Sequence, residues 1–424
     1  MKETSKSDFL TKICLFIIAL YLILGNIPRI VQLPALKNSI AITEIILYFV
    51  MISFALLNMR ILVANLTKIG AIACIIVFSF CYGVLINGFE FNPLLYSVRL
   101  ILILLSANIA GNLLFNLYKR DLIKGLNFIL NIYLGLLLIS IAIYLIFPNS
   151  VDLWNFLFQF GITINGDPHQ KRFVSSYFDP NFYGAIVLIP MIISAFLFKE
   201  TYKRKFLFLL IAFSVSLYLT YSRSGLGAAL ILLLVILVIN FFKKKKKGFK
   251  LRNVVLFWSS LPIVLLLLYF NIDKLRIIDR FLNLGSDASA LARLTTFHFG
   301  FNIFSDNPLM GIGYDYLGIR MSSFTGITSV DSSLLAILIN FGILFTFIMF
   351  MIFIYSIVKT RGRLKSKFEK KSEHLRFYDL FMIYVLISIV FTSQFNNLLL
   401  YQFWLFPCTM MWSYITHISK SSVQ

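Results

Sequence analysis

The stretch FLFLLIAFSVSLYLTYSRSGLGAALILLLVILVINFFKKKKK, residues 206–247, decides the fold class of this chain. It contains two apolar runs, 206–222 and 225–242, and each is about as long as an α-helix must be to cross the hydrocarbon core of a bilayer. Only a short polar turn around Arg223 separates the two runs, and five lysines follow the second one. Adjoining spans with a tight turn at one face and a cationic run at the other are typical of a polytopic helical membrane protein.

The same apolar pattern recurs along the whole chain. Of its 424 residues, 59% are hydrophobic and 13% are charged, whereas about 25% of the residues in soluble domains are charged. This composition excludes a disordered chain and does not fit a cytosolic globule. We therefore predict an all-α polytopic membrane protein of about 12 transmembrane helices, with residues 1–424 forming one integral membrane domain. The predicted spans are 9–26, 39–57, 69–87, 93–115, 125–147, 181–198, 206–222, 225–242, 253–270, 332–355, 378–394 and 398–416.

The distribution of positive charge predicts the orientation of these spans. Loops on the cytoplasmic side of a membrane carry an excess of lysine and arginine. If the N-terminus is cytoplasmic, the residues placed on that side carry the whole net charge of +21. Both termini are then cytoplasmic, and the lysine run 243–247 acts as a topology signal, not as a nucleic-acid site. Two long loops, 148–180 and 271–331, lie on the outer side, which suggests work at the outer membrane surface.

The turn inside the opening stretch is the sharpest candidate for a binding site. Arg223 lies at the N-terminus of the following span, where free N–H groups and a partial positive charge favour phosphate. Its planar guanidinium suits phosphate oxygens, and Ser222 and Ser224 add hydrogen-bond donors. The alternative is an arginine that caps the hairpin and reaches toward the headgroups. We predict an anion site.

Two further segments add arginines to the same face. Arg172 precedes Asp179 and Asn181, and the Pro that follows Asp179 makes this aspartate a suitable helix N-cap. The cap explains Asp179 but not Arg172, so we assign Arg172 to the anion site. We place Asp179 and Asn181 with it among the residues that bind the diphosphate or glycan. Arg99 lies about two turns inside the fourth span. It either contacts the anion or forms a structural pair with Glu44.

The second long loop supplies more arginines and contains weakly amphipathic helical stretches. We assign Arg276 and Arg280 to the binding of a diphosphate or glycan. Arg293 precedes a helical stretch that ends near Asn307, and it is a catalytic candidate. Arg320 is also available in this loop.

Neither a dinucleotide nor a metal site is expected. The sequence Gly311-Ile312-Gly313 is typical of a turn with permissive glycines. It is not a dinucleotide-binding motif, because no strand precedes it and the third glycine is absent. The four cysteines and four histidines are scattered, without a CxxC pair. We therefore predict no metal site and no cofactor.

These motifs, taken in order, resemble the O-antigen ligase and Wzy-type polymerase superfamily. Its members typically show an Arg-Phe…Asp-Pro-Asn segment that enters a span, a Ser-Arg-Ser-Gly hairpin, an arginine in a large periplasmic loop, and an Asn-Pro-Leu-x-Gly-x-Gly turn. The resemblance covers about 170–345, and the order of the motifs on one face makes it fairly specific. The chain supplies them at Arg172 to Asn181, Ser222 to Gly225, Arg293, and Asn307 to Gly313.

The chain departs from the family in the last motif, a pattern like His-Asn-x-x-Leu-x-x-Leu-x-Glu-x-Gly that opens the next span. Asp331 stands at the histidine position and Asn340 at the glutamate position, while the spacing to Gly342 is kept. In ligases that histidine is thought to activate the acceptor, so its absence favours the polymerase branch. Asp331 is our first candidate for the base that accepts the acceptor's proton, with Asp179 and Asp315 behind it. The alternative for Asp331 is an N-cap of the tenth span.

The resemblance implies a GT-C-like architecture and a metal-independent glycosyltransferase of the bacterial inner (cytoplasmic) membrane. Such a polymerase joins undecaprenyl-diphosphate-linked oligosaccharide repeat units into O-antigen or a related surface polysaccharide at the periplasmic face, as in lipopolysaccharide biosynthesis. Donor and acceptor are then both lipid-linked glycans embedded among membrane lipids, and a chain-length regulator protein is a further partner to test. Charge that develops on the departing diphosphate calls for preorganised cations, for which Arg223 and Arg293 are the catalytic candidates.

Two other functions stay open. A ligase would transfer the finished glycan to lipid A-core instead of to a second lipid-linked unit. A flippase or other transporter of lipid-linked oligosaccharides could also use many spans and buried arginines. Such a transporter more often shows short loops and two related halves.

Overall fold

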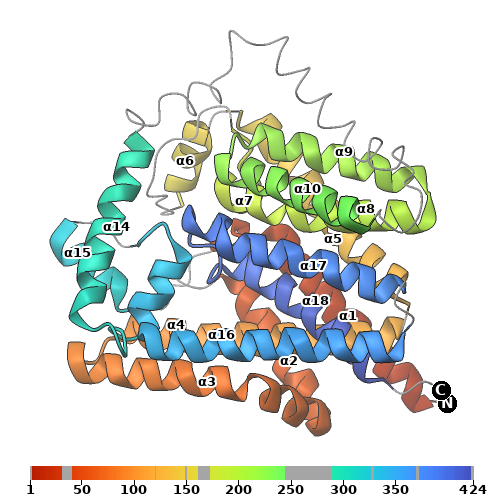
Figure 1. Cartoon of the computed structure of the whole chain (residues 1–424), viewed down its shortest axis with the longest axis horizontal. Coiled ribbons are helices and arrows are strands. Elements are labelled where there is room, and N and C mark those ends of the chain that lie inside the picture. Colours follow the sequence, from red (N-terminus) through yellow and green to blue (C-terminus); the bar gives the residue numbers. More distant parts are fainter. Residues whose placement is uncertain are drawn as a thin grey trace.

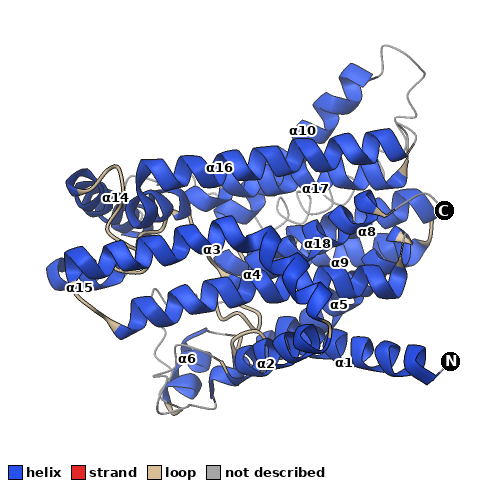
Figure 2. Ribbon diagram, turned by 90° about the horizontal axis from the view of Figure 1, so that it is seen from below, coloured by secondary structure: helices blue, strands red, loops and turns tan. Residues whose placement is uncertain are grey.

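The computed structural model describes residues 2–30, 41–119, 121–148, 150–160, 172–243, 288–325, 329–368 and 372–421, and within these ranges the chain is helical without a strand. Most of the long helices run in a similar direction, horizontal in Figure 1, and Figure 2 shows the same bundle from below. The helices are α1 (Lys2–Leu24), η1 (Ile27–Ile30), α2 (Ile42–Leu57), α3 (Met59–Asn87), α4 (Phe91–Tyr118), α5 (Leu122–Ile146), α6 (Ser150–Phe158), α7 (Pro180–Ile186), α8 (Leu188–Thr201), α9 (Arg204–Leu219), α10 (Arg223–Lys243), α14 (Ala288–Asp306), α15 (Leu317–Thr325), α16 (Ser333–Lys367), α17 (Glu373–Val390), η5 (Thr392–Gln394) and α18 (Gln402–Lys420).

Several of these helices are suited to a membrane. By length and composition, 6 helical segments of the described chain could cross a bilayer, and three shorter apolar helices accompany them. Every predicted span except 253–270, which lies outside the described residues, coincides with a helix or a pair of consecutive helices. The structure thus supports a helical membrane protein, while the count of twelve spans and the GT-C-like architecture stay predictions.

The outward-facing side chains fit a lipid environment. Large apolar residues are exposed along the helices, for example Phe49 at 71%, Leu145 at 74% and Leu85 at 83%. Large exposed apolar patches are rare on soluble monomers. In a bilayer the same side chains face hydrocarbon and carry no penalty.

The centre of the bundle is formed by α4 packed closely on α18. A Cβ added to Gly111 of α4 would lie 2.5 Å from the carbonyl oxygen of Met410, so only glycine allows this approach. Ser413 of α18 donates a hydrogen bond to the backbone oxygen of Asn108 at 3.0 Å. Small residues and backbone-directed hydroxyls are the usual means of tight helix packing in membranes. This contact holds the first turn of α18 beside the outer part of α4.

Segments that the charge pattern predicts on opposite faces of the membrane lie at opposite ends of the bundle. Near the chain termini, Arg376 pairs with Glu200 at 2.6 Å and Arg361 pairs with Asp379 at 2.8 Å. The helices α6, α14 and α15 lie at the opposite end, on the left in Figure 1. Segments predicted to share a face therefore lie together. Which end faces the cytoplasm stays a prediction.

The tenth predicted span is broken, which the apolar pattern did not reveal. Gly342 inside α16 has φ 68° and ψ 176°, a conformation outside the helical region. The break frees backbone groups that residues 308–312 satisfy: the N–H of Ile312 donates to the oxygen of Ile339 at 2.8 Å, and the N–H of Ile343 donates to the oxygen of Pro308 at 2.9 Å. The backbone of the Asn307–Gly313 motif thus forms hydrogen bonds with groups that the break in α16 leaves free.

Candidate active site

A polar cavity of about 220 Å³ lies at the end of the bundle that carries α14 and α15. It is bounded by the first half of α4, the first turns of α16 and α18, and the loop before α15. Two arginines, one aspartate and three side-chain amides line it, together with aromatic and apolar groups. The polar lining residues are Arg29, Tyr96, Arg99, Tyr314, Asp315, Ser329, Asn340, Asn397, Tyr401 and Gln402.

Arg99 lines this cavity and is also the structural partner of Glu44. Its Nε and one terminal nitrogen donate to the two carboxylate oxygens of Glu44 at 2.8 and 2.9 Å. Arg99 also donates to Gln402, whose own amide donates to Glu44 at 2.7 Å. Glu44 is fully buried and Arg99 is 12% exposed. The pair that we weighed as the alternative is present, and it fixes the guanidinium at the cavity wall while balancing its charge.

Asp315 reaches the cavity because the preceding loop enters the break in α16. A Cβ at Gly311 would lie 2.6 Å from the backbone nitrogen of Gly342, and Gly313 packs directly on Gly83 of α3. The loop is fixed further along, where the Tyr316 hydroxyl donates to a backbone oxygen of the α3–α4 connection at 2.8 Å. Asp315 itself has φ 63°. The glycines of the motif therefore serve close backbone packing that places a carboxylate.

The chemistry of Asp315 is set by its burial. Desolvation raises the pKa of this carboxyl to about 7, although the positive charge of Arg99 acts to lower it. A carboxyl with a pKa near the working pH can accept and return a proton efficiently. In a cavity lined by arginines and amides, such a group marks a candidate site for acid–base chemistry.

The predicted hairpin site is tightly packed in the structure. Ser222 and Ser224 are buried, and their hydroxyl oxygens lie 3.2 Å apart. The amide of Asn396 donates to Ser224 at 3.1 Å. A Cβ at Gly225 would lie 2.8 Å from the carbonyl oxygen of Gly184, so this glycine lets α10 pack on α7. The hydroxyls therefore hold the hairpin, and their predicted contact with a ligand stays a prediction.

Arg223 is the first residue of α10 and is half-buried. The residue is thus at the helix N-terminus, as the sequence predicts. This end carries the partial positive charge of the helix dipole.

Arg172 and Asn181, which the sequence predicts to belong to one binding site, are in contact. Arg172 donates from Nε to the backbone oxygen of Thr220 at 2.7 Å and from a terminal nitrogen to the Asn181 side-chain oxygen at 3.0 Å. The buried guanidinium therefore ties the first long loop to the start of the hairpin turn. Asp179 caps α7 by accepting from the backbone N–H groups of Asn181 and Phe182 at 2.6 and 3.1 Å. Burial raises the pKa of Asp179, and the charge of Arg172 opposes that shift.

Arg293 and Asp331 form an ion pair across α14 and the start of α16. The Arg293 Nε lies 3.5 Å from a carboxylate oxygen of Asp331, whose side chain is 49% exposed. Burial raises the pKa of Asp331, and Arg293 lowers it. The N-cap of α16 is Ser332, which accepts from the backbone N–H of Leu335. Our alternative role for Asp331, the helix cap, is therefore wrong, and its carboxylate faces a cation instead.

Comparison with known families identifies part of this region. Residues 206–351 match the family model Wzy_C, described as O-Antigen ligase. The finding confirms the resemblance to the O-antigen ligase and Wzy superfamily. No curated protein matches the chain.

The matched residues 206–351 hold part of the site only. They include the hairpin of Arg223, the Arg293–Asp331 pair and Asp315, which come from three different segments. Arg99 and Arg172 precede them, and α18 follows them. The cavity is therefore completed by parts of the chain that the family match does not cover.

The first cavity residue that sequence reasoning missed is Arg29 in η1. It lines the cavity, and its buried Nε has no hydrogen-bond partner in the described part of the chain. Positive charge on the outer side runs against the usual distribution. An arginine directly after the first span was the available signal.

The second missed feature is the segment between η5 and α18. Asn396 bonds to Ser224 of the hairpin, and its backbone oxygen accepts from Ser333 at 2.9 Å. The next residue, Asn397, lines the cavity, and its side-chain oxygen has no partner among the described residues. This segment joins the hairpin, the start of α16 and the cavity. Five polar residues within 392–397, interrupted only by Phe395, stand where two predicted spans meet, and they were the signal.

Arg276 and Arg280 lie outside the described residues, so their assignment stays a prediction. Arg320 lies beside α3, where its Nε donates to the side-chain oxygen of Asn87 at 2.7 Å. Within the described ranges, no group of three or more His, Cys, Asp or Glu side chains could hold a metal ion.

Proposed function

We propose that this chain is a polysaccharide polymerase that joins lipid-diphosphate-linked oligosaccharide units at the outer face of the bacterial inner membrane. The main observation behind the proposal is the polar cavity, where two arginines and a carboxyl of pKa about 7 lie at one end of the helical bundle. Residues 206–351 of the same bundle match a family described as O-antigen ligase. Undecaprenyl-diphosphate-linked glycans are the proposed donor and acceptor. A buried site at the membrane end suits a substrate whose lipid stays in the bilayer while its sugar projects outward.

The proposed reaction is a single displacement. A hydroxyl of the acceptor sugar attacks the anomeric carbon of the donor, and the bond from that carbon to the lipid diphosphate breaks. The hydroxyl proton passes to a carboxylate, and the electron pair of the broken bond leaves with the diphosphate. Arginines held in place before the reaction stabilise the negative charge that develops there. The proposal assigns no step to a metal.

The geometry favours Asp315 as the base, ahead of Asp331. Asp315 lines the cavity, and burial brings its pKa to about 7. Asp331 is half-exposed and paired with Arg293. We assign Arg29 to the departing diphosphate, and we keep Arg223 and Arg293 as the cations that approach from the hairpin and from α14.

A ligase is the second candidate, because the matching family is described as O-antigen ligase. The proposal for a polymerase rests on Asp331 at the position where ligases typically carry histidine. A carboxylate can accept a proton from a sugar hydroxyl, but it cannot donate from a cationic N–H as a protonated imidazole can.

A gene deletion distinguishes the two candidates. Loss of a polymerase leaves lipopolysaccharide that carries a single repeat unit, because an independent ligase still works. Loss of the ligase leaves bare core, while polymer accumulates on the lipid carrier. Gel analysis of lipopolysaccharide from the deletion strain reads out the difference, and bare core would overturn the polymerase assignment.

A further inference from the structure

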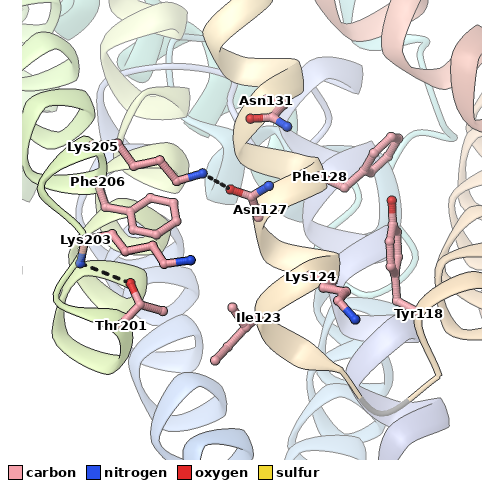
Figure 3. A pocket seen from close by; sticks show the side chains of 10 residues that line it. All are labelled: Tyr118, Ile123, Lys124, Asn127, Phe128, Asn131, Thr201, Lys203, Lys205 and Phe206. Carbon is pink, nitrogen blue, oxygen red and sulfur yellow. Dashed lines mark hydrogen bonds between the residues drawn. The ribbon is translucent and has the colours of Figure 1, made fainter.

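A second cavity lies at the opposite end of the bundle, away from the candidate active site. It measures about 290 Å³ and sits among the end of α4, the first half of α5 and the α8–α9 connection. Figure 3 shows its side chains, which come from three separate parts of the chain. The lining residues are Tyr118, Ile123, Lys124, Asn127, Phe128, Asn131, Thr201, Lys203, Lys205 and Phe206.

The charge of this cavity is positive. Three lysines and no carboxylate line it. Lys124 pairs with Asp121 at 3.0 Å outside the lining, whereas no described carboxylate lies within ion-pair distance of Lys203 or Lys205. The neighbouring acid Glu200 is engaged by Arg376 at 2.6 Å. The cavity therefore keeps two positive charges that no carboxylate of the described residues neutralises.

The side chains of Lys203 and Lys205 are exposed to solvent, and both extend along the cavity wall. Lys205 donates to the side-chain oxygen of Asn127 at 3.2 Å, and its ammonium lies 4.6 Å from the ring centre of Phe206. In Figure 3 the side chain of Lys203 extends from the α8–α9 connection into the same space. The positive-inside rule requires only that a lysine lie on the cytoplasmic face. It does not require the lysine to line a cavity.

Two amides continue the polar lining along α5. Asn127 and Asn131 are one helical turn apart, and Asn131 is exposed although it lies more than two turns from the start of α5 at Leu122. An exposed amide at that depth faces hydrocarbon unless a polar ligand meets it, and an unmet amide is costly there. Asn131 therefore indicates a ligand whose polar atoms reach below the membrane surface.

The remaining walls are apolar and aromatic. Ile123, Phe128 and Phe206 line the cavity beside Tyr118, whose ring centre lies 5.9 Å from that of Phe128. A small soluble anion would gain no binding energy from these apolar walls. A phospholipid has a phosphate for the lysines, ester oxygens for the amides and acyl chains for the apolar surface.

We propose that this pocket binds the phosphate headgroup of an anionic phospholipid in the leaflet at that end of the protein. Basic pockets between transmembrane helices recognise anionic headgroups in this way. The site is independent of the outer cavity and of the reaction proposed for it, because the two share no residue.

The test uses the purified full-length protein in a neutral detergent. Native mass spectrometry would measure binding of phosphatidylglycerol and of zwitterionic phosphatidylcholine. The variant Lys203→Gln/Lys205→Gln removes the two unneutralised charges, and we expect phosphatidylglycerol to bind about thirtyfold more weakly. The control Lys12→Gln/Lys365→Gln removes the same charge from exposed positions outside the pocket and should bind as the wild type does.

A third variant separates lipid binding from a purely topological role. Asn131→Leu changes no charge and favours insertion, yet it should weaken phosphatidylglycerol binding several-fold. Equal binding by all four proteins, or equal retention of both lipids by the wild type, would overturn the proposal. So would thermal stabilisation by glycerol 3-phosphate as large as that by phosphatidylglycerol, because the site would then take a soluble anion.

Discussion

At the scale of single residues, the candidate site depends on how burial and charge act on a few side chains. Arg99 is fixed and balanced by Glu44, whereas Arg29 keeps a buried Nε without a partner among the described residues. Asp315 lies between these extremes, because burial disfavours its charge while Arg99 favours it. The same cavity therefore holds a cation available to a ligand and a carboxyl that titrates near neutrality.

The first prediction concerns the pH dependence that Asp315 confers. A base must be deprotonated, and burial raises the pKa of Asp315 to about 7. Polymerisation should therefore fall as the pH drops through about 7 and reach a plateau above it. The rate is measured with purified enzyme and lipid-linked units between pH 5.5 and 8.5. Asp315→Asn should abolish the reaction, and a variant with an unchanged rate and pH profile would remove Asp315 from the mechanism.

The second prediction concerns Arg223. Arg223→Ala should abolish glycan elongation while leaving membrane insertion intact, because the half-buried side chain lies at a helix end and not in the core. Arg223→Lys should rescue poorly, since a point charge replaces a planar fork. Polymer length on a gel, at matched protein level, is the readout, and the exposed Arg60→Ala serves as a control. Strong inhibition of the wild-type enzyme by EDTA would instead indicate a cation in the reaction.

At the scale of elements, the sequence predicted the helices better than their irregularities. Hydropathy located the spans, and the Ser-Arg-Ser-Gly hairpin and the Asp179 cap form as expected. The break at Gly342 was hidden, because a hydropathy pattern reads an apolar run as continuous. Hydropathy does not show that a loop from another part of the chain forms hydrogen bonds with the backbone groups freed at the break.

Pairings across helices were only partly predictable. The sequence offers Glu44 as a partner of Arg99, because both charges lie inside predicted spans, and it places Arg172 and Asn181 in one motif. Arg29 and Asn397 were missed, because single polar residues in short connections carry no periodic signal. Their roles depend on the packing of α4 against α18, which one sequence does not specify.

The third prediction tests the break in α16. A Cβ at Gly342 would project directly onto the Leu309 carbonyl, and its φ of 68° strains any other residue. Gly342→Ala should lower the stability by about 3 kcal/mol or more and displace the loop that carries Asp315. The matched control is Gly362→Ala in the same helix, where a Cβ meets nothing within 4 Å. That substitution should be neutral or slightly stabilising.

Thermal unfolding in detergent and the polymerisation rate together read out both variants. Gly342→Ala should show a clearly lower Tm and lost activity, and Gly362→Ala should show neither. If Gly342→Ala unfolded like the wild type and stayed active, the break in α16 would not be needed to place Asp315.

At the scale of the whole molecule, the two cavities lie at opposite ends of one bundle. The cavity near α15 contains cations and a titrating carboxyl, as a reaction site requires, whereas the other contains lysines that no described carboxylate neutralises. This asymmetry agrees with the predicted orientation, in which the segments assigned to the cytoplasmic side carry the whole net charge of +21.

The last prediction tests which end faces the cytoplasm. Because basic segments are retained on the cytoplasmic side, the end with α14 should be accessible from outside. In a background without the four native cysteines, Ser305→Cys at the exposed end of α14 should react with a membrane-impermeant maleimide in spheroplasts. Lys365→Cys, exposed at the other end, should react only after the membrane is permeabilised. Labelling in the reverse pattern would place the candidate active site on the cytoplasmic face, where lipid-linked units are assembled but where the proposed polymerisation does not occur.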